Sequence, residues 1–195
     1  MLNSKQQFQN RKGFSLIEFV LVIGISSMII LIIFSLYNIS TNALIYADEK
    51  NETLLYGRYI IDYIKYEVRN ADLIIKSDKI VDLDIRYPNN IGFVIMVDRG
   101  EKYYENNHEK RYGYHTYHLK GNLFERIAYN SNNAKYPKAS QFSGYNGVYD
   151  KVYSIDDTIL HYDNKLLLLS VTLGIDEKDT STYKSTIYLY NKLDY

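Results

Sequence analysis

The feature that most constrains this chain is an apolar segment near its start, which runs from Phe14 to Tyr37. Roughly 20 apolar residues at about 1.5 Å each form about 30 Å of helix, the hydrocarbon thickness of a bilayer. Glu18 is the one charged side chain in this segment. A carboxylate in hydrocarbon costs about 2.5–3.5 kcal/mol on insertion scales. The segment therefore predicts a membrane-spanning helix, and Glu18 needs a partner that the helix itself does not supply.

A specific motif stands at the head of this helix: Lys-Gly, then Phe, then Ser-Leu-Ile-Glu, covering residues 12–18. With the apolar run behind it, the motif resembles the class III signal of type IV prepilins and type II secretion pseudopilins. The resemblance implies that a membrane-embedded prepilin peptidase cuts between Gly13 and Phe14. It also implies methylation of the new amine of Phe14, and pairing of Glu18 with the terminal amine of a neighbouring pilin subunit.

The spacing agrees with that pairing. Glu18 lies four residues from Phe14, or about 6 Å along a helix axis. A neighbour displaced by about that distance brings its terminal ammonium beside the carboxylate. Two unpaired charges are costly in a low dielectric, whereas a pair attracts strongly. Glu18 thus favours docking in one register.

Two simpler interpretations remain open for the same segment. A secretory signal peptide has a basic start, but its apolar core is about 7–15 residues and ends in a small-residue cleavage site. This run is longer and lacks an Ala-x-Ala ending. The second alternative is a plain single-span anchor in which Glu18 is incidental.

Charge and composition limit the function classes. The 195 residues carry a formal net charge of zero, so no bulk electrostatic attraction for nucleic acid is expected. Cysteine is absent, so an exported domain must be held by its core and sheets alone. Basic residues precede the span and a mostly acidic stretch, residues 48–52, follows it. This asymmetry predicts a single-pass protein of the cytoplasmic membrane with its N-terminus inside and its C-terminus outside.

Residues 38–71 continue as a predicted helix. Asn38, Ser40, Thr41 and Asn42 form helix weakly and are expected to bend or loosen it. Apolar residues then recur at steps near three, four and seven, which predicts a stripe packed on a sheet. The stripe consists of Leu44, Ala47, Leu54, Ile61, Ile64, Val68 and Ala71.

From Asp72 onward the pattern changes to β-strands. Strands are predicted within 73–75, 80–85, 91–97, 112–119, 123–129, 159–162, 166–173 and 183–190. Lys120-Gly121-Asn122 is a hairpin signal between two of them. Residues 130–158 are expected to form a long loop. The fold class is therefore α+β, with one long N-terminal helix, its first half transmembrane, packed on an antiparallel sheet.

This layout is that of pilins, and short matches are similar to minor pilins of the PilW and pseudopilin J type. They comprise Val68-Arg69-Asn70-Ala71 at the helix end, the hairpin 117–126 and the terminal Tyr190-Asn191. The predicted organisation is a leader at 1–13, a transmembrane helix at 14–37, its continuation at 38–71 and an extracytoplasmic head at 72–195. After assembly the subunit is expected in a cell-surface pilus.

No motif indicates an enzyme, a cofactor or a metal. His115 and His118 point to opposite faces of a strand, since the side-chain period is two, so they cannot share a zinc ion. Asp156, Asp157 and Asp163 lack EF-hand spacing and are interpreted as a polar loop. In two segments, 102–104 and 111–114, basic residues alternate with tyrosines. This pattern can hold single-stranded nucleic acid, but it also packs a β-surface.

Three functions follow from these observations. The first is a minor pilin or pseudopilin that is trimmed after Gly13 and is assembled into, or primes, a fibre. The second is a single-span membrane protein whose outer domain binds a ligand. The third is a DNA-uptake competence pilus subunit.

Overall fold

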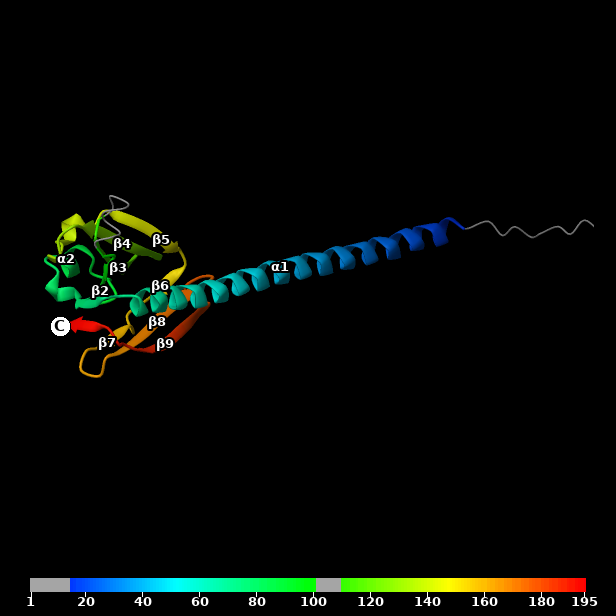
Figure 1. Ribbon diagram of the computed structural model, residues 1–195. Coiled ribbons are helices and arrows are strands. Elements are labelled where there is room, and N and C mark those ends of the chain that lie inside the picture. Colours follow the sequence, from blue (N-terminus) through cyan, green and yellow to red (C-terminus); the bar gives the residue numbers. More distant parts are fainter. Residues whose placement is uncertain (1–14, 101–109) are drawn as a thin grey trace, which may run out of the picture. The chain divides into compact units, whose positions relative to one another are not determined.

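The computed structural model describes residues 15–100 and 110–195 (Figure 1). The predicted cleavage pair, Gly13 and Phe14, lies outside the described residues. By internal contacts the chain divides after Ala47 into two units, residues 1–47 and 48–195, and each is described by itself. The first helix, α1 (Leu16–Arg69), belongs to both.

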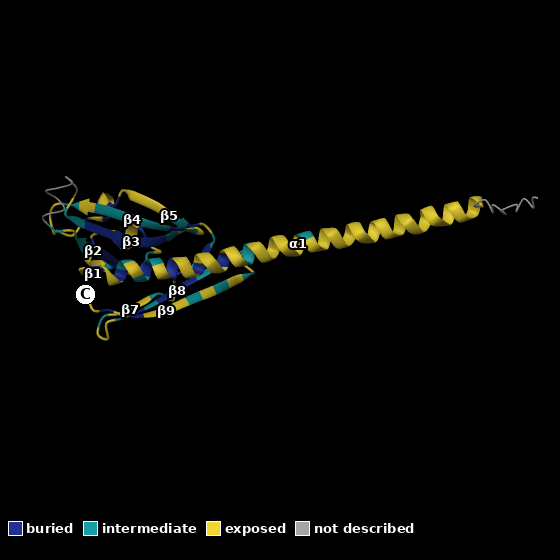
Figure 2. Cartoon of the chain, turned by 45° about the vertical axis from the view of Figure 1, so that its right-hand side comes forward, coloured by how far each residue is buried: buried dark blue, intermediate teal, exposed yellow. Residues whose placement is uncertain are grey.

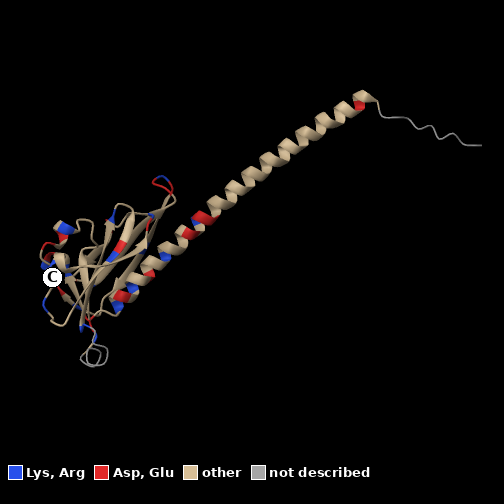
Figure 3. Cartoon of the chain, turned by 90° about the horizontal axis from the view of Figure 1, so that it is seen from above, with Lys and Arg blue, Asp and Glu red and all other residues tan. Residues whose placement is uncertain are grey.

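In the first unit, α1 is apolar on every side. All described residues up to Ala47 are exposed except Thr41, which is half-buried (Figure 2). Its charge pattern is equally simple, because Glu18 is the one charged residue between Ser15 and Ala47 (Figure 3). The helix carries on through Asn38 to Asn42, so these residues do not interrupt it.

The second unit contains the rest of α1 and all of the strands. These elements confirm the α+β class: a long N-terminal helix packs on largely antiparallel sheet. The short helices are η1 (Ser77–Lys79), α2 (Leu83–Arg86) and η2 (Ala139–Gln141). The strands are β1 (Leu73–Lys76), β2 (Phe93–Asp98), β3 (Tyr112–Lys120), β4 (Leu123–Ser131), β5 (Gly144–Tyr149), β6 (Val152–Ser154), β7 (Ile159–His161), β8 (Leu166–Gly174), β9 (Thr180–Tyr188) and β10 (Lys192–Asp194).

The strands form two sheets. The larger has the order β10-β1-β2-β3-β4-β5, in which β1 and β10 are parallel and the other pairs antiparallel. In the smaller, β8 pairs with β9 along one edge and with β6 and β7 along the other. Alternation along a strand defines which face is apolar but not which strands share a sheet.

One apolar core joins the inner faces of both sheets to the second half of α1. The helix side of this core consists of Thr53, Gly57, Ile60, Ile61, Ile64 and Val68. The predicted stripe is therefore confirmed from Ile61 onward. It is wrong for Leu44, Ala47 and Leu54, which are exposed, Leu44 at 64% and Leu54 at 38%. The small residues Thr53 and Gly57 take the buried positions there, and at Gly57 the ring of Tyr183 on β9 lies against the helix.

The predicted strand over 80–85 is wrong. Asp82 has a left-handed backbone, with φ of 62°, and α2 follows it. Ile80, Leu83 and Tyr87 are the buried residues, at helical steps of three and four. They cover the outer face of the larger sheet and form a second apolar core with Val94 and others.

The expected loop over 130–158 is also wrong in part, because it contains β5 and β6. β5 is an edge strand whose partner is β4. Its outward edge is in solvent, so its sequence lacks the alternation of a half-buried strand. β5 is a strand because it pairs with β4, and its local sequence does not indicate this.

The predicted hairpin is confirmed. β3 and β4 pair from Tyr112 with Ser131 to Lys120 with Leu123, leaving Gly121 and Asn122 as a two-residue loop. Gly121 has φ of 60°, which the first position of a type II′ turn requires.

The contact between α1 and β9 depends on Gly57. A Cβ atom placed there would lie 2.5 Å from ring carbons of Tyr183. Gly57→Ala gains about 1 kcal/mol of helix propensity, but overpacking of this kind costs about 1–3 kcal/mol. We expect a loss of about 1 kcal/mol in the free energy of unfolding, measured by urea denaturation of the full chain in non-ionic detergent.

The matched test repeats the substitution in a Tyr183→Ala background. With the ring gone, only helix propensity remains, so Gly57→Ala should there raise the free energy of unfolding. The same sign in both backgrounds would contradict the packing argument.

Candidate functional site

The start of α1 positions the first candidate site residue. The backbone N–H of Ser15 donates to Oε2 of Glu18 at 2.9 Å, and the N–H of Glu18 donates to Oγ of Ser15 at 3.3 Å. This reciprocal pair is a capping box, which satisfies two backbone donors that the first helical turn leaves free. Among the described residues, Glu18 has no cationic partner.

The helix behind Glu18 is the one described helix that is long and apolar enough to cross a membrane. Its large side chains are exposed along the whole span, for example Phe19 at 61% and Phe34 at 63%. So large an apolar surface is not stable in water and marks contact with lipid or with other protein. The chain thus carries a single-pass membrane anchor near its N-terminus.

A second group of polar residues lies buried between α1 and the β3–β4 hairpin. Arg126 approaches Oε1 of Glu67 with Nε and Nη2, each at 2.9 Å. The hydroxyl of Tyr117 donates to Oε2 of Glu67, and Nε2 of His115 lies 3.0 Å from the same oxygen. Nε2 lies within hydrogen-bond distance of this oxygen but is not aligned for a hydrogen bond within the described residues.

Strand register explains how these residues meet. Tyr117 and Arg126 are direct partners across the hairpin, and His115 is two residues from Tyr117, on the same face. Glu67 stands beside the buried Val68 on the side of α1 that this face covers. The side chains of Glu67 and His115 are 11% and 7% exposed. A cavity of about 250 Å³ adjoins the group.

The electrostatics of this group are those of a fixed ion pair. Burial alone would raise the pKa of Glu67, but contacts with His115, Arg126 and Tyr117 lower it to about 2. Burial lowers the pKa of His115; the Glu67 carboxylate opposes this shift, and Arg126 and Arg99 add to it. Glu67 is therefore an anion held by Arg126, and its role is to attach α1 to the hairpin.

The structure keeps His115 and His118 apart, as the strand period predicts. His115 faces Glu67 on the inner side of β3. His118 lies on the other face, with Nε2 3.0 Å from Glu125 and its ring 4.8 Å from that of Tyr87. Among the described residues, no three metal-ligating side chains gather.

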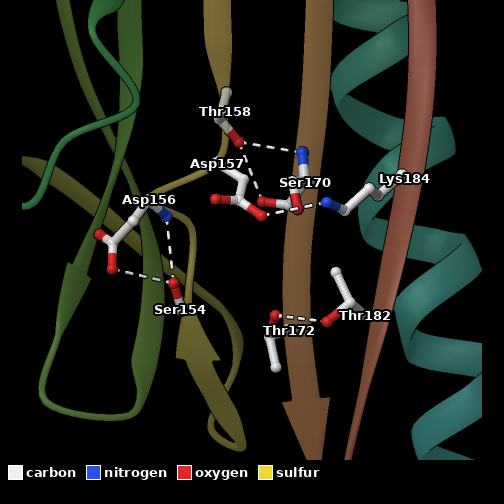
Figure 4. A network of polar contacts seen from close by, with 8 residues as sticks. All are labelled: Ser154, Asp156, Asp157, Thr158, Ser170, Thr172, Thr182 and Lys184. Atoms are coloured by element: carbon white, nitrogen blue, oxygen red, sulfur yellow. Dashed lines mark hydrogen bonds and ion pairs between the residues drawn. The ribbon is translucent and has the colours of Figure 1, made fainter.

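The acidic pair Asp156 and Asp157 is divided between separate contacts (Figure 4). Asp156 accepts a hydrogen bond from Ser154 at 3.0 Å, whereas Asp157 lies 3.0 Å from Nζ of Lys184 on β9. Thr158 and Ser170 bond to each other close by, and the hydroxyls of Thr172 and Thr182 meet across β8 and β9. These contacts link neighbouring strands on the outer face of the smaller sheet.

The basic and tyrosine residues at 111–114 make contacts within the folded domain. Arg111 pairs with Asp98 at 2.9 Å, and its guanidinium lies 5.0 Å from the ring centre of Tyr112. Tyr114 is 1% exposed, so it offers no face for stacking. The companion segment, residues 102–104, lies outside the described residues.

Comparison of this chain with family models, with curated proteins and with solved structures gives no match.

The buried ion pair predicts how stability depends on pH. Because the folded pKa of His115 is below its unfolded value of 6.5, only the unfolded chain gains a proton there as pH falls. Stability should therefore decrease below pH 6.5, by up to about 1.4 kcal/mol per pH unit for this group. Glu67 adds a further loss from pH 4.5 down to about 2.

His115→Gln should flatten the first part of this profile, measured by urea denaturation of the full chain in detergent at a series of pH values. His161→Gln is the matched control, because His161 is exposed on β7 and should leave the slope unchanged. An unchanged slope in His115→Gln would contradict the assignment.

Proposed function

We propose that the chain is a minor type IV pilin or pseudopilin. A prepilin peptidase removes residues 1–13, Phe14 is methylated, and Glu18 and helix packing draw the subunit into a pilus or pseudopilus. Before assembly the chain is held in the cytoplasmic membrane with its N-terminus inside and its head outside. The observation that carries the proposal is a lone carboxylate at the start of a helix whose apolar first half is exposed.

The exposed surface of the helix supports packing against like helices. A single span needs apolar side chains only, yet this one also carries an acid without a cationic partner in its own described chain. A neighbouring subunit's terminal ammonium would supply that partner. Charge pairing of this kind rewards one register and penalises others, which is what an ordered fibre requires.

The capping box gives Glu18 a second role that must be separated from the first. In the single chain its carboxylate accepts from the backbone of Ser15. An amide at this position keeps the cap, because Glu and Gln serve equally in a capping box. It removes the charge on which pairing with an ammonium depends. Substitutions at this site can therefore distinguish helix capping from subunit pairing.

Cleavage is tested by intact mass after co-expression with a prepilin peptidase. We expect loss of residues 1–13 and gain of one methyl group. Gly13→Val should block the cut, because a branched side chain crowds the scissile backbone. An uncut wild-type chain would contradict the proposal and favour the single-span ligand-binding protein; normal processing of Gly13→Val would show that the cut is elsewhere.

Assembly is tested by the amount of subunit recovered in sheared fibres. Glu18→Ala and Glu18→Gln should both be cut but incorporated poorly, by about tenfold or more, since each removes the charge. Ser15→Ala weakens the cap and keeps the charge, so it should assemble close to normally. If Glu18→Gln assembles normally while Glu18→Ala does not, Glu18 acts as a cap and the pairing hypothesis is wrong.

A further inference from the structure

A second cavity lies on the outer face of the larger sheet, away from the Glu67 group. Its volume is about 470 Å³, within the range of small-ligand sites. The polar and aromatic side chains that line it come from the end of α2, both strands of the β3–β4 hairpin and the edge strand β5. They are Arg86, Tyr87, His118, Lys120, Glu125 and Tyr145.

The floor of this cavity is held in place before any ligand arrives. The hydroxyls of Tyr87 and Tyr145 lie 2.8 Å apart, and the Tyr87 ring packs on His118. Nε2 of His118 lies 3.0 Å from Glu125, and these two side chains are 8% and 13% exposed. Tyr145 is 48% exposed, so part of its ring is open to solvent. A site whose groups are already fixed loses little freedom on binding.

The charges of the cavity are mixed, with a surplus of one positive charge. Arg86 and Lys120 are exposed cations at the rim, and Glu125, paired with His118 in the floor, is an anion. Burial lowers the pKa of His118; Glu125 opposes that shift, while Lys120 adds to it. The imidazole is therefore neutral at pH 7. The surplus suits a ligand that carries one negative charge.

We propose that this cavity binds a hexuronic acid, a six-membered sugar ring that carries one carboxylate and several hydroxyls. The carboxylate meets Arg86 and Lys120, and the hydroxyls donate to Glu125. The apolar face of the ring packs on the open part of Tyr145. This inference goes beyond the proposed assembly function and does not rest on it.

A nucleotide fits the same cavity less well. Tyr87 is only 5% exposed and Arg86 already lies 5.9 Å from its ring centre, so a base, like the sugar ring, could pack only on the open part of Tyr145. A phosphate would also bring two negative charges toward Glu125. The carboxylate of a hexuronic acid brings one negative charge. The hydroxyls of its sugar ring can donate hydrogen bonds to Glu125, which offsets the repulsion.

The test is a saturation-transfer NMR titration of the full chain in polyoxyethylene micelles, which contain no sugar headgroup. D-Glucuronate should bind with a Kd of about 1 mM, typical of a ligand of this size. Glucose, which lacks the carboxylate, and acetate, which lacks the ring, should each bind more weakly by about threefold or more. With ¹³C-labelled histidine, the His118 resonance should shift on addition of glucuronate.

Two variants probe the assigned roles. Lys120→Gln should raise the Kd of glucuronate about three- to fivefold. Its matched control is Lys184→Gln on β9, which removes the same charge from an exposed position in the other sheet and should change nothing. Glu125→Gln removes the negative charge and keeps one weaker acceptor oxygen, so it should strengthen acetate binding by more than it strengthens glucuronate binding.

Four results would overturn the proposal. No saturation by glucuronate at about ten times the expected Kd would remove the site. Equal binding of acetate would reduce it to a carboxylate contact. Tighter binding of adenosine monophosphate at the same His118 resonance would make it a nucleotide site. An equal rise in the Kd of glucuronate for Lys184→Gln and Lys120→Gln would show that binding depends on the overall charge of the protein.

Discussion

The packing of the second half of α1 against both sheets is the interaction on which the head depends. Ile60, Ile64 and Val68 enter one core with apolar residues from the two inner faces. Gly57 lets the ring of Tyr183 approach the helix backbone, and Glu67 fixes the far end to Arg126. Removing the helix would leave two sheets with open apolar faces and a buried guanidinium without its partner. The same helix is therefore both the anchor and the central element of the head's core.

Two acidic residues of this helix, Glu67 and Glu18, differ in whether the described part of the folded chain supplies a cationic partner. Glu67 is buried, but the hairpin brings Arg126, Tyr117 and His115 to it, so it stays ionised. Glu18 has only the neutral Ser15 beside it within the described chain. The first charge is satisfied by folding. The second is satisfied, in the proposed function, by a second copy or a related subunit.

The two proposals concern different parts of the chain and can fail separately. Assembly depends on the first turns of α1, whereas sugar binding depends on the outer face of the larger sheet. If both hold, the chain is an anchored or fibre-borne domain that contacts acidic polysaccharide. If cleavage fails and glucuronate binds, the chain is the single-span ligand-binding protein instead.

The sequence by itself determined the anchor, the α+β order, the hairpin and the separation of His115 from His118. These features depend on local patterns: an apolar run, a turn glycine and the two-residue period of a strand. It did not reveal Glu67, whose partners are about 50 to 60 residues away in the chain. The one available signal was that residues 115 and 117 share a face, and nothing in the sequence placed α1 against it.

Only the tertiary structure decided the two sheets, the edge strand β5 and the helical turn that replaces the expected strand at 80–85. Each depends on a contact between distant segments: β5 on β4, and Ile80, Leu83 and Tyr87 on the outer face of the sheet. Local propensity is weak at such positions, so burial against a distant surface determines the backbone. The outer cavity follows for the same reason, since three separate segments meet to form it.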